Sequence, residues 1–363
     1  MDFSLTHEQQ ALADSVRRYG EREYGPEQRH GLLRSTEGFS RDNWRNFAEL
    51  GWLGAGLAEE LGGFGGGPVE TMIIQEQMGR ALMLEPFLSS AVLAALAIAA
   101  QGTREQREEL LPAIVAGERL AALANGPDMA AVRIGDGYVL NGRANFVLGG
   151  PSADLLLIPA RGVSGVSLFQ VDPAAPGLTR HDYHSVDGRR VSDIVLESVG
   201  VRPGALLGKE GTAAPAIALA EDHAVMGLCA EAVGAMDAAL WLTRDYLKMR
   251  RQFGTALSDF QALQHRMADM LIETELARSI LYRGVAALSE TDPTARRKGV
   301  SAAKVYVGEA GYFVGAQAIQ LHGAIGVTEE HIVGHYFKRL TLVRGLFGTT
   351  DAHLALFAQG VRA

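Results

Sequence analysis

The residues with the clearest chemical potential lie in one short segment, residues 246–254, between two long segments with helical spacing of apolar residues. Arg250, Phe253 and Gly254 fall in the turn that joins these segments. An arginine fork matches a phosphate group, an aromatic ring offers a stacking face, and glycine lets a backbone approach a ligand closely. The turn therefore has the residues to hold a phosphate and a planar ring. The same residues also fit a plain helix end, where basic side chains complement the helix dipole.

Composition sets broad limits on the class of protein. The chain has 363 residues, of which 47% are hydrophobic and 21% charged, which is typical of a folded globular protein with more than one core. The formal net charge of −8 argues against a nucleic-acid-binding protein, because such proteins carry an excess of basic residues. An anionic ligand would have to be bound by local arginines and lysines.

The sequence gives no signal for disulfides, metal binding, secretion or membrane insertion. Cys229 is the single cysteine and lies in an apolar helical run, so we expect a buried, inert thiol. The N-terminal residues lack the basic and apolar regions of a signal peptide. We find no run of about 18 strongly apolar residues. We therefore expect a cytoplasmic protein that binds no metal, membrane or nucleic acid.

Apolar periodicity divides the chain into three regions. Residues 6–118 show helical spacing, and Thr6 and Gln9 have the spacing of a capping box at its start. Between residues 120 and 197, short apolar runs separated by Gly, Pro, Asn and Asp predict strands. The pattern then becomes helical again. The helices predicted in this last region cover residues 213–248, 260–288, 293–321 and 329–341, with a tail helix at 351–359.

This order of elements predicts an α+β fold with three domains. We expect an N-terminal helical domain at residues 1–118, a middle antiparallel β domain at 119–212 and a C-terminal four-helix bundle at 213–363. Closely spaced strands without intervening helices favour an antiparallel sheet or small barrel. No Gly-x-Gly-x-x-Gly motif links a strand to a helix, which excludes a doubly wound dinucleotide-binding domain.

Several local motifs occur in order along the chain. They read Asp-Phe-Ser-Leu-Thr-His-Glu-Gln at 2–9, Glu-Glu-Leu-Gly-Gly-Phe-Gly-Gly-Gly-Pro at 59–68, Gly-Tyr-Val-Leu-Asn-Gly-Arg at 137–143, Tyr-x-x-x-Arg-x-x-Phe-Gly at 246–254 and Gln-Leu-His-Gly-Ala-Ile-Gly at 320–326. In this order they resemble the acyl-CoA dehydrogenase family over essentially the whole chain. The resemblance implies an FAD-dependent enzyme that introduces an α,β double bond into an acyl-CoA and passes electrons to an electron-transfer flavoprotein. It also implies a homo- or hetero-oligomer built as a dimer of dimers.

The resemblance further implies which residues bind FAD. In the family, the motif that matches residues 246–254 contacts the FAD phosphates and adenine across a subunit interface. Its arginine suits a pyrophosphate, and nearby glutamines can donate hydrogen bonds without adding charge. The implied cofactor-binding residues are Arg250, Phe253, Gly254, Gln261, Gln320, Gly323, Thr349 and Asp351.

Three stretches depart from the family pattern. Phe347 stands where the family commonly has the glutamate that removes the substrate α-proton, and Ala224 stands at the other position used for this base. Residues 124–131 lack the hydroxyls and acids expected there. Residues 145–150 replace the Trp-Ile-Thr-Asn-Gly stretch that packs against the flavin ring. The chain thus keeps the residues implied to bind ADP and lacks those that cradle flavin and deprotonate substrate.

This combination resembles the partner subunit of heteromeric acyl-CoA dehydrogenases, and most closely the pimeloyl-CoA dehydrogenase small-subunit type. We therefore expect another chain to supply the base and the flavin cradle. One alternative is a self-sufficient homo-oligomeric dehydrogenase with a relocated base, either Asp222 or Glu231, which lie nine residues apart on one helix face. A second alternative is a non-catalytic structural subunit that holds neither flavin nor substrate. The sequence assigns neither the catalytic base nor the acyl chain.

Overall fold

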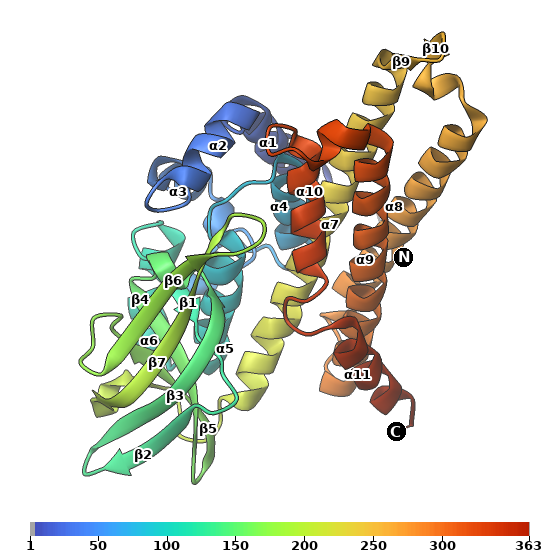
Figure 1. Ribbon diagram of the computed structural model, residues 1–363. Coiled ribbons are helices and arrows are strands. Elements are labelled where there is room, and N and C mark those ends of the chain that lie inside the picture. Colours follow the sequence, from blue (N-terminus) through green and yellow to red (C-terminus); the bar gives the residue numbers. More distant parts are fainter. Residues whose placement is uncertain (1–3, 363) are drawn as a thin grey trace. The chain divides into compact units, whose positions relative to one another are not determined.

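The protein divides into two compact units, each built from segments that are far apart in sequence. The structure is a computed structural model that describes residues 4–362 (Figure 1). One unit, the helical unit, contains the described residues up to His30, Pro68–Met83 and the chain from Val225 onward. The other, the sheet unit, contains Gly31–Gly67 and Leu84–Ala224. The three domain limits expected from sequence remain predictions.

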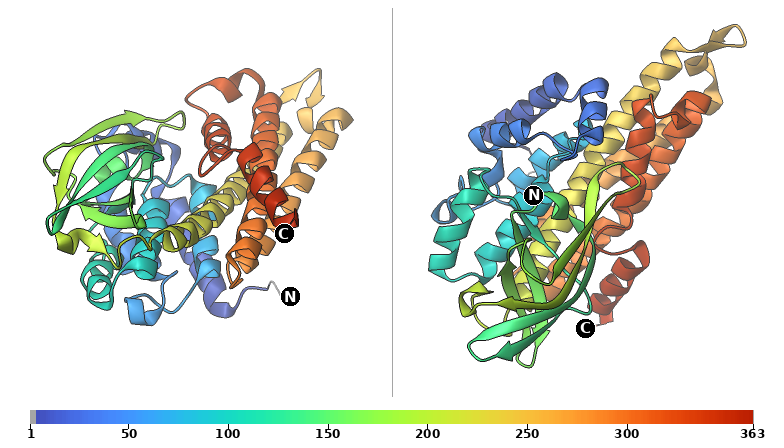
Figure 2. Two further views of the ribbon diagram at one scale, coloured as in Figure 1. Left: turned by 90° about the horizontal axis from the view of Figure 1, so that it is seen from below. Right: turned by 60° about the vertical axis from the view of Figure 1, so that its left-hand side comes forward.

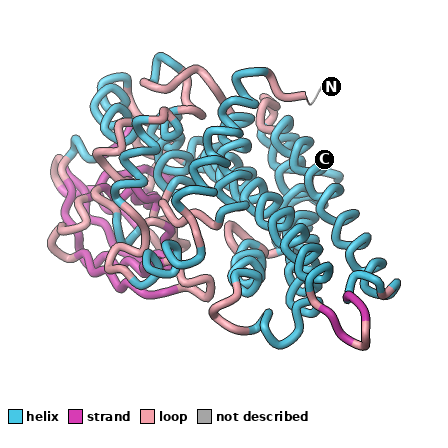
Figure 3. The backbone as a smooth tube through the Cα atoms, turned by 90° about the horizontal axis from the view of Figure 1, so that it is seen from above, coloured by secondary structure: helices cyan, strands magenta, loops and turns pink. Residues whose placement is uncertain are grey.

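Long helices dominate the helical unit, and they confirm the predicted C-terminal helical bundle (Figure 2). Two very short strands form a hairpin between two of these helices, and Figure 3 shows this hairpin in magenta at their end. The elements are α1 (His7–Glu23), α4 (Pro68–Ala81), α7 (Ala214–Met249, which begins in the sheet unit), β9 (Arg251–Gln252), β10 (Thr255–Ala256), α8 (Gln261–Ala287), α9 (Pro293–His322), α10 (Ile332–Val343) and α11 (Thr350–Arg362).

The sheet unit combines shorter helices with one eight-stranded sheet. Its helices are α2 (Pro26–Arg34, which begins in the helical unit), α3 (Arg41–Glu49), the π-helical η3 (Leu88–Ala94), α5 (Ala95–Gln101) and α6 (Arg104–Val115). Its strands are β1 (Ala121–Leu123), β2 (Ala130–Ile134), β3 (Gly137–Leu148), β4 (Leu155–Gly162), β5 (Gly165–Val171), β6 (Leu178–His184), β7 (Arg190–Val201) and β8 (Leu206–Leu207).

The sheet confirms the predicted middle β domain, with two local exceptions to its antiparallel order. The strands follow the order β6-β7-β3-β2-β4-β5-β8, and β1 pairs with β4. The pairing of β1 with β4 is parallel, and so is a single contact of Ala130 in β2 with Arg161 in β4. Inward-facing side chains such as Leu140, Ile158 and Phe169 are fully buried and form the core beneath the sheet.

The start of α1 has the capping box that its sequence predicts. The Thr6 side chain accepts a hydrogen bond from the Gln9 backbone N–H at 3.2 Å, and the Gln9 side chain accepts one from the Thr6 N–H at 3.0 Å. Thr103 and Gln106 form a second capping box at the start of α6. These reciprocal bonds satisfy backbone donors that have no partner inside the helix, and so they fix where each helix begins.

The helix α7 is long and apolar enough to cross a membrane by length and composition alone, a property that the sequence analysis overlooked. However, 83% of its most apolar 18-residue window is buried inside the protein. Burial of this extent is typical of the central helix of a folded domain, whose apolar residues face other helices on all sides.

Within the helical unit, α4 and α7 cross at backbone contact. A Cβ atom on Gly79 would lie 1.9 Å from the carbonyl oxygen of Glu231, and one on Gly234 would lie 1.8 Å from that of Glu76. Real side chains cannot occupy such positions, so the two glycines are what allows the helices to approach this closely. The crossing places the side chains of Glu76 and Glu231 next to the interface of the two helices.

Candidate functional site

The predicted phosphate-binding turn forms the hairpin that follows α7. The Arg250 N–H donates to the Tyr246 carbonyl at 2.8 Å and so continues the helix by one residue. Gln252 pairs with Thr255, which leaves Phe253 and Gly254 as a two-residue turn. Both have positive φ, 54° and 87°, as the hairpin turn that suits strand twist requires. The Phe253 ring is 91% exposed at this tip.

An exposed aromatic residue in a left-handed conformation is costly to the isolated chain. A residue other than glycine, asparagine or aspartate rarely adopts this conformation, and strain of this kind is frequent at binding sites. The ring of Phe253 makes one described aromatic contact, an edge-on approach to Phe260 with centroids 6.2 Å apart. The hairpin projects beyond the neighbouring helix ends of the same unit (Figure 1). Its tip is therefore available to a ligand or to another chain.

The end of α9 lies beside the end of α7, which brings two predicted parts of the site together. The Tyr246 hydroxyl donates to the carbonyl oxygen of His322 at 3.2 Å, and the two rings stack with centroids 4.4 Å apart. Gly323 follows at once with φ 67°, and it is exposed. Gln320 is also exposed in the last turn of α9. Hydrogen-bond donors on the hairpin after α7 and at the end of α9 thus remain open to a ligand. We call these two segments the two arms of the site.

Gln261 is the first residue of α8. Its side chain is exposed, and it follows the hairpin closely in sequence. The implied ADP-binding residues Arg250, Phe253, Gly254, Gln261, Gln320 and Gly323 therefore gather around one end of the helical unit. Their exposure and chemistry fit a dinucleotide, because a guanidinium, an aromatic face and neutral amide donors are all available there.

Thr349 and Asp351 lie at the start of α11, away from the hairpin. Thr349 accepts a hydrogen bond from the Ala352 N–H at 3.3 Å, and both predicted residues are exposed. The loop before them is bonded to Lys304 in α9, which lies about 27 Å from the end of α9 at the α-helical rise of 1.5 Å per residue. The structure thus separates these two residues from the other six.

Phe347, at the position of the family's base, sits in a loop whose backbone is held on several sides. Its φ is 57°. Its carbonyl oxygen accepts a hydrogen bond at 3.1 Å from His353 Nε2, and His353 Nδ1 lies 3.1 Å from the Ser301 hydroxyl. Since a carbonyl only accepts, the hydrogen sits on Nε2 and Nδ1 is the acceptor. Burial lowers the pKa of His353, which favours this neutral form.

Lys304 in α9 also binds the backbone of this loop. Its ammonium donates to the carbonyl oxygens of Val343 at 2.9 Å, Arg344 at 3.1 Å and Gly348 at 3.4 Å. These carbonyls include the C-terminal end of α10, where a cation is favourable. Burial lowers the pKa of Lys304, and burial raises that of the nearby Cys229 thiol to about 12. The cysteine is therefore the inert, buried thiol that the sequence predicts.

Glu231, one candidate for a relocated base, is held in a buried ion pair. Arg339 Nε donates to Glu231 Oε1 at 2.9 Å, and Arg339 Nη2 donates to Oε2 at 2.6 Å. Each residue is 2% exposed. A bidentate arginine stabilises the ionised carboxylate and occupies both of its oxygens. This arrangement disfavours Glu231 as the group that takes a substrate proton.

Asp222, the other candidate, belongs to the sheet unit. It lies in the first part of α7 and is 1% exposed. On the preceding position, Glu221 accepts a hydrogen bond at 2.9 Å from Asn125 Nδ2. Ala224, at the second family position for a base, is fully buried and has no group that could accept a proton. Asp222 thus remains the carboxylate on α7 that the structure leaves as a candidate.

The stretch that replaces the family's flavin-packing motif is an irregular part of β3. The register against β7 shifts between Ala144 and Val147, and Phe146 has φ 56°. The Phe146 N–H donates to Asp193 at 3.0 Å, and the hydroxyl of Tyr183 donates to the same oxygen at 2.8 Å. The bulge is therefore stabilised by protein contacts of its own. It offers no hydroxyl in place of the family's threonine.

Two further basic residues, His335 and Arg190, have structural partners. His335 accepts from Arg29 Nη1 at 3.0 Å and donates to the Glu329 carbonyl at 3.0 Å, so both ring nitrogens are bonded. Arg190 donates to the carbonyl oxygen of Thr36 within the sheet unit. These contacts account for the two residues without a phosphate ligand.

Sequence reasoning missed several polar residues because their partners are distant in the chain. Arg278 in α8 bonds to both Glu76 in α4 and Asp237 in α7, and Arg80 bonds to Asp237 at 2.6 Å. His353, which bonds to the Phe347 carbonyl, was also missed. Isolated residues of these types give no pattern in a sequence, so no periodicity or motif could have identified them.

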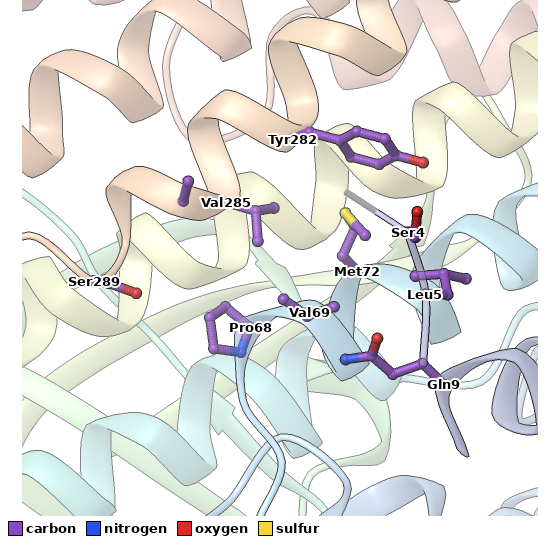
Figure 4. A pocket seen from close by; sticks show the side chains of 10 residues that line it. Ser4, Leu5, Gln9, Pro68, Val69, Met72, Tyr282, Val285 and Ser289 are labelled. Atoms are coloured by element: carbon purple, nitrogen blue, oxygen red, sulfur yellow. The ribbon is translucent and has the colours of Figure 1, made fainter. Parts of the chain in front are cut away.

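A cleft of about 280 Å³ lies at the other end of α8 (Figure 4). Met72 and Val69 from α4 and Tyr282 and Val285 from α8 form its apolar wall, with the hydroxyl of Ser289 near its rim. Along α8, the nearest lining residue, Tyr282, lies about 32 Å from Gln261. The cleft is therefore distinct from the hairpin end of the unit.

Comparison with known proteins identifies relatives along the whole chain. Residues 6–118 match the family described as "Acyl-CoA dehydrogenase, N-terminal domain", and residues 220–361 match "Acyl-CoA dehydrogenase, C-terminal domain". The chain is 31% identical to "Acryloyl-CoA reductase (NADH)" of Anaerotignum propionicum, over 99% of this chain and 96% of that protein.

Solved structures show the same fold. A chain of the ChsE4-ChsE5 complex from Mycobacterium tuberculosis is 27% identical with a TM-score of 0.93, covering 100% of this chain and 99% of that chain. A chain of the Tcur3481-Tcur3483 steroid ACAD is 32% identical with a TM-score of 0.89, covering 98% of each chain.

Proposed function

Because the chain belongs to the acyl-CoA dehydrogenase family, whose members are FAD-dependent oxidoreductases acting on CH–CH bonds, we propose that it works as one subunit of a heteromeric acyl-CoA dehydrogenase. In this role the end of the helical unit around Arg250 and Gln320 binds the ADP half of an FAD. A partner chain holds the flavin ring of the same FAD and supplies the base. The likeness to the pimeloyl-CoA dehydrogenase small-subunit type is part of this proposal.

One observation carries the proposal. The ADP-binding residues are exposed at one end of α9, while the loop with Phe347 and the residues Thr349 and Asp351 lies about 27 Å away along that helix. A dinucleotide bound at Arg250 would have to span this distance to reach the loop of its own chain. A second chain at the hairpin end removes this requirement.

Two similar structures support the heteromeric part of the proposal. Both the ChsE4-ChsE5 complex and the Tcur3481-Tcur3483 protein are named for two different gene products. Closed two-fold assemblies bring the same surface of two related subunits together. A pair of related but unequal chains can therefore divide one duplicated site between them.

The chemistry of the reaction favours a second chain that supplies the base. An α,β-dehydrogenation requires a base for the α-proton, and FAD supplies the acceptor for the hydride that leaves the β-carbon. Phe347 cannot accept a proton, and Glu231 is held by Arg339. We propose that the acyl-CoA reacts at the partner's carboxylate and that the electrons pass on to an electron-transfer flavoprotein.

Cofactor retention in the assembled enzyme tests the proposal. Arg250→Ala should lower the FAD content that survives gel filtration by roughly tenfold or more, because a charge-assisted bidentate contact is lost. Arg251→Ala is the matched control, since Arg251 is an exposed arginine on the same hairpin. Equal FAD content in the two variants would contradict the role of the hairpin.

The buried Asp222 favours a second candidate, a self-sufficient dehydrogenase. Asp222 is 1% exposed and lies in the first part of α7, where the described chain has no other candidate base. If the chain purified alone contains flavin that acyl-CoA bleaches, and Asp222→Asn abolishes the bleaching, the chain carries its own base. If the lone chain holds no flavin, and the partner chain binds flavin equally well with and without this subunit, the subunit has a structural role.

A further inference from the structure

Three rings form a stack between the two arms of the proposed ADP site. Tyr246 and His322 stack with centroids 4.4 Å apart and planes inclined by 26°. His331 packs against this pair at a tilt: its centroid lies 4.7 Å from that of His322 with planes inclined by 54°, and it is edge-on to Tyr246 at 6.5 Å. Each ring belongs to a different segment, namely the end of α7, the end of α9 and the residue before α10. The stack therefore joins three segments at one point of the helical unit.

The stack is built from residues next to those proposed to bind the dinucleotide. Tyr246 is one helical turn before Arg250 and accepts its N–H, and its hydroxyl donates to the His322 carbonyl. His322 is followed by Gly323 and is only 3% exposed, whereas Arg250 and Gly323 are exposed. A change in the stack would thus change the separation of the two arms without touching the ligand.

Additional hydrogen bonds anchor the two histidines. His322 Nδ1 donates to the Ala318 carbonyl at 2.8 Å, which makes Nε2 an acceptor, and Nε2 has no hydrogen-bond partner among the described residues. His331 Nδ1 accepts from the Val333 N–H at 3.3 Å and so caps α10. Both rings are consequently held in one orientation in their neutral form.

We propose that the stack of Tyr246, His322 and His331 positions the two arms of the ADP site and makes their grip on the cofactor dependent on neutral histidines. This inference rests on the proposed function, because it assumes that the two arms bind the ADP half of FAD. The three residues act as positioning residues, since the cofactor contacts are made by their neighbours. Stacked rings are suited to this role because their separation is fixed within narrow limits.

Protonation would disturb this arrangement. A proton on His322 Nε2 would create a buried donor without an acceptor and a charge next to His331. Burial and the proximity of His331 lower the pKa of His322, while its bond to Ala318 raises it. Burial also lowers the pKa of His331. Among the described residues, no carboxylate contributes to either shift.

The test measures the rate of FAD release from the assembled heteromer by the rise in flavin fluorescence. His322→Ala removes the ring, and we expect roughly tenfold faster release at about pH 7.5. His322→Phe keeps a ring but cannot be protonated, so it should restore slow release. Between about pH 7.5 and about pH 5.5, release should accelerate for the native protein and accelerate less for the Phe variant, in which His331 is the one ring of the stack that can still be protonated.

Two further variants separate this inference from the proposed function. Tyr246→Phe keeps the stack and removes only the hydroxyl contact, and it should speed release by roughly threefold. Arg250→Ala serves as the benchmark for the ADP site. If Arg250→Ala speeds release but His322→Ala and Tyr246→Phe do not, the positioning role is wrong and the proposed function stands. If none of the three changes the rate, the proposed function itself is wrong.

Discussion

The buried pair of Glu231 and Arg339 shows how a single contact decides the chemistry of a residue. Removing two charges from water is expensive, and the mutual attraction offsets this cost only with good geometry. Here both carboxylate oxygens are bonded to one guanidinium. The pair joins α7 to α10, from which the Phe347 loop continues. Glu231 is therefore a structural partner, although its position on α7 makes it look like a candidate base.

Glu231→Gln should destabilise the protein because it removes the buried carboxylate charge to which Arg339 donates two hydrogen bonds. We expect a loss of about 3–5 kcal/mol in the free energy of unfolding, measured by urea denaturation. The control is Glu309→Gln, which affects a half-exposed pair with Arg344 and should cost about 1 kcal/mol or less. A Glu231→Gln protein that keeps full stability but loses reduction by acyl-CoA would identify Glu231 as the base after all.

The contact between Glu231 and Arg339 also marks the limit of prediction from sequence at this scale. The two residues are separated by 108 positions, and neither belongs to a motif. The same holds for His353, whose partner Phe347 was noticed only through the family resemblance. By contrast, Arg250, Phe253 and Gly254 were identified because their spacing within one turn is itself the signal.

At the scale of elements, the hairpin β9–β10 combines exposure with backbone strain. Phe253 holds a left-handed conformation that costs an ordinary residue about 1–2 kcal/mol. Its ring is almost fully exposed, so packing within the helical unit offsets little of this strain energy. Such a combination is expected where a segment is built to bind something outside its own chain.

Phe253→Gly should separate stability from binding. Glycine adopts positive φ readily, so the melting temperature of the chain alone should stay the same or rise slightly. FAD retention in the heteromer should fall, because the ring that we expect to contact the dinucleotide is lost. Calorimetry of the lone chain and flavin absorbance of the heteromer measure the two effects. A large drop in stability without loss of FAD would assign the ring a packing role.

The crossing of α4 and α7 depends on two glycines. Gly79→Ala would place a methyl group 1.9 Å from the Glu231 carbonyl oxygen, so the helices would have to separate. We expect a loss of about 1–3 kcal/mol or more in the free energy of unfolding. Gly31→Ala is the control, because nothing lies within 4 Å of the added methyl group in α2, and it should be neutral or slightly stabilising. Equal effects of both substitutions would contradict the close crossing.

Regular elements with apolar periodicity were predicted well, and polar ones were not. The predicted helices at 260–288 and 293–321 differ from α8 and α9 by at most one residue at each end. The strand β6 was missed because nearly all of its residues are polar and exposed, so it has no apolar run. The helix α2 was not predicted as a separate element within the helical region 6–118, because its own apolar residues show no helical period. Register and strand order come from long-range pairing, which local pattern does not encode.

At the scale of the whole molecule, four histidines link stability to pH. Burial is the largest cause that lowers the pKa of His322, His331, His335 and His353 below the ordinary value of 6.5. As the pH falls below about 6.5, the unfolded chain therefore binds protons that the folded chain does not. The stability from neutral, buried histidines is complete above this pH and declines as the pH falls through the lowered values.

The melting temperature should accordingly fall between about pH 7.5 and about pH 5.5. His353→Gln should reduce this dependence, because the glutamine amide can donate to the Phe347 carbonyl without titrating. The control is His265→Gln, at an exposed position on α8, which should leave the pH profile unchanged. A native protein that is equally stable at both pH values would show that these histidines are not buried in neutral form.

The proposed roles of the two chains set the number of FAD molecules that the assembly can hold. In a pseudo-symmetric pair of related chains there are two places for an FAD, each built from the ADP-binding end of one chain and the flavin cradle of the other. In the proposed assembly this chain provides the ADP-binding end, because its stretch at residues 145–150 lacks the family's cradle and Phe347 stands at the position of the base. One of the two places should therefore be filled.

The ratio of flavin to polypeptide in the purified heteromer tests this claim most directly. Absorbance of the released flavin, divided by the amount of each chain, should give about one FAD for every two chains. The lone chain should hold almost none. One FAD on every chain, or a lone chain that binds flavin and is reduced by acyl-CoA, would contradict the account.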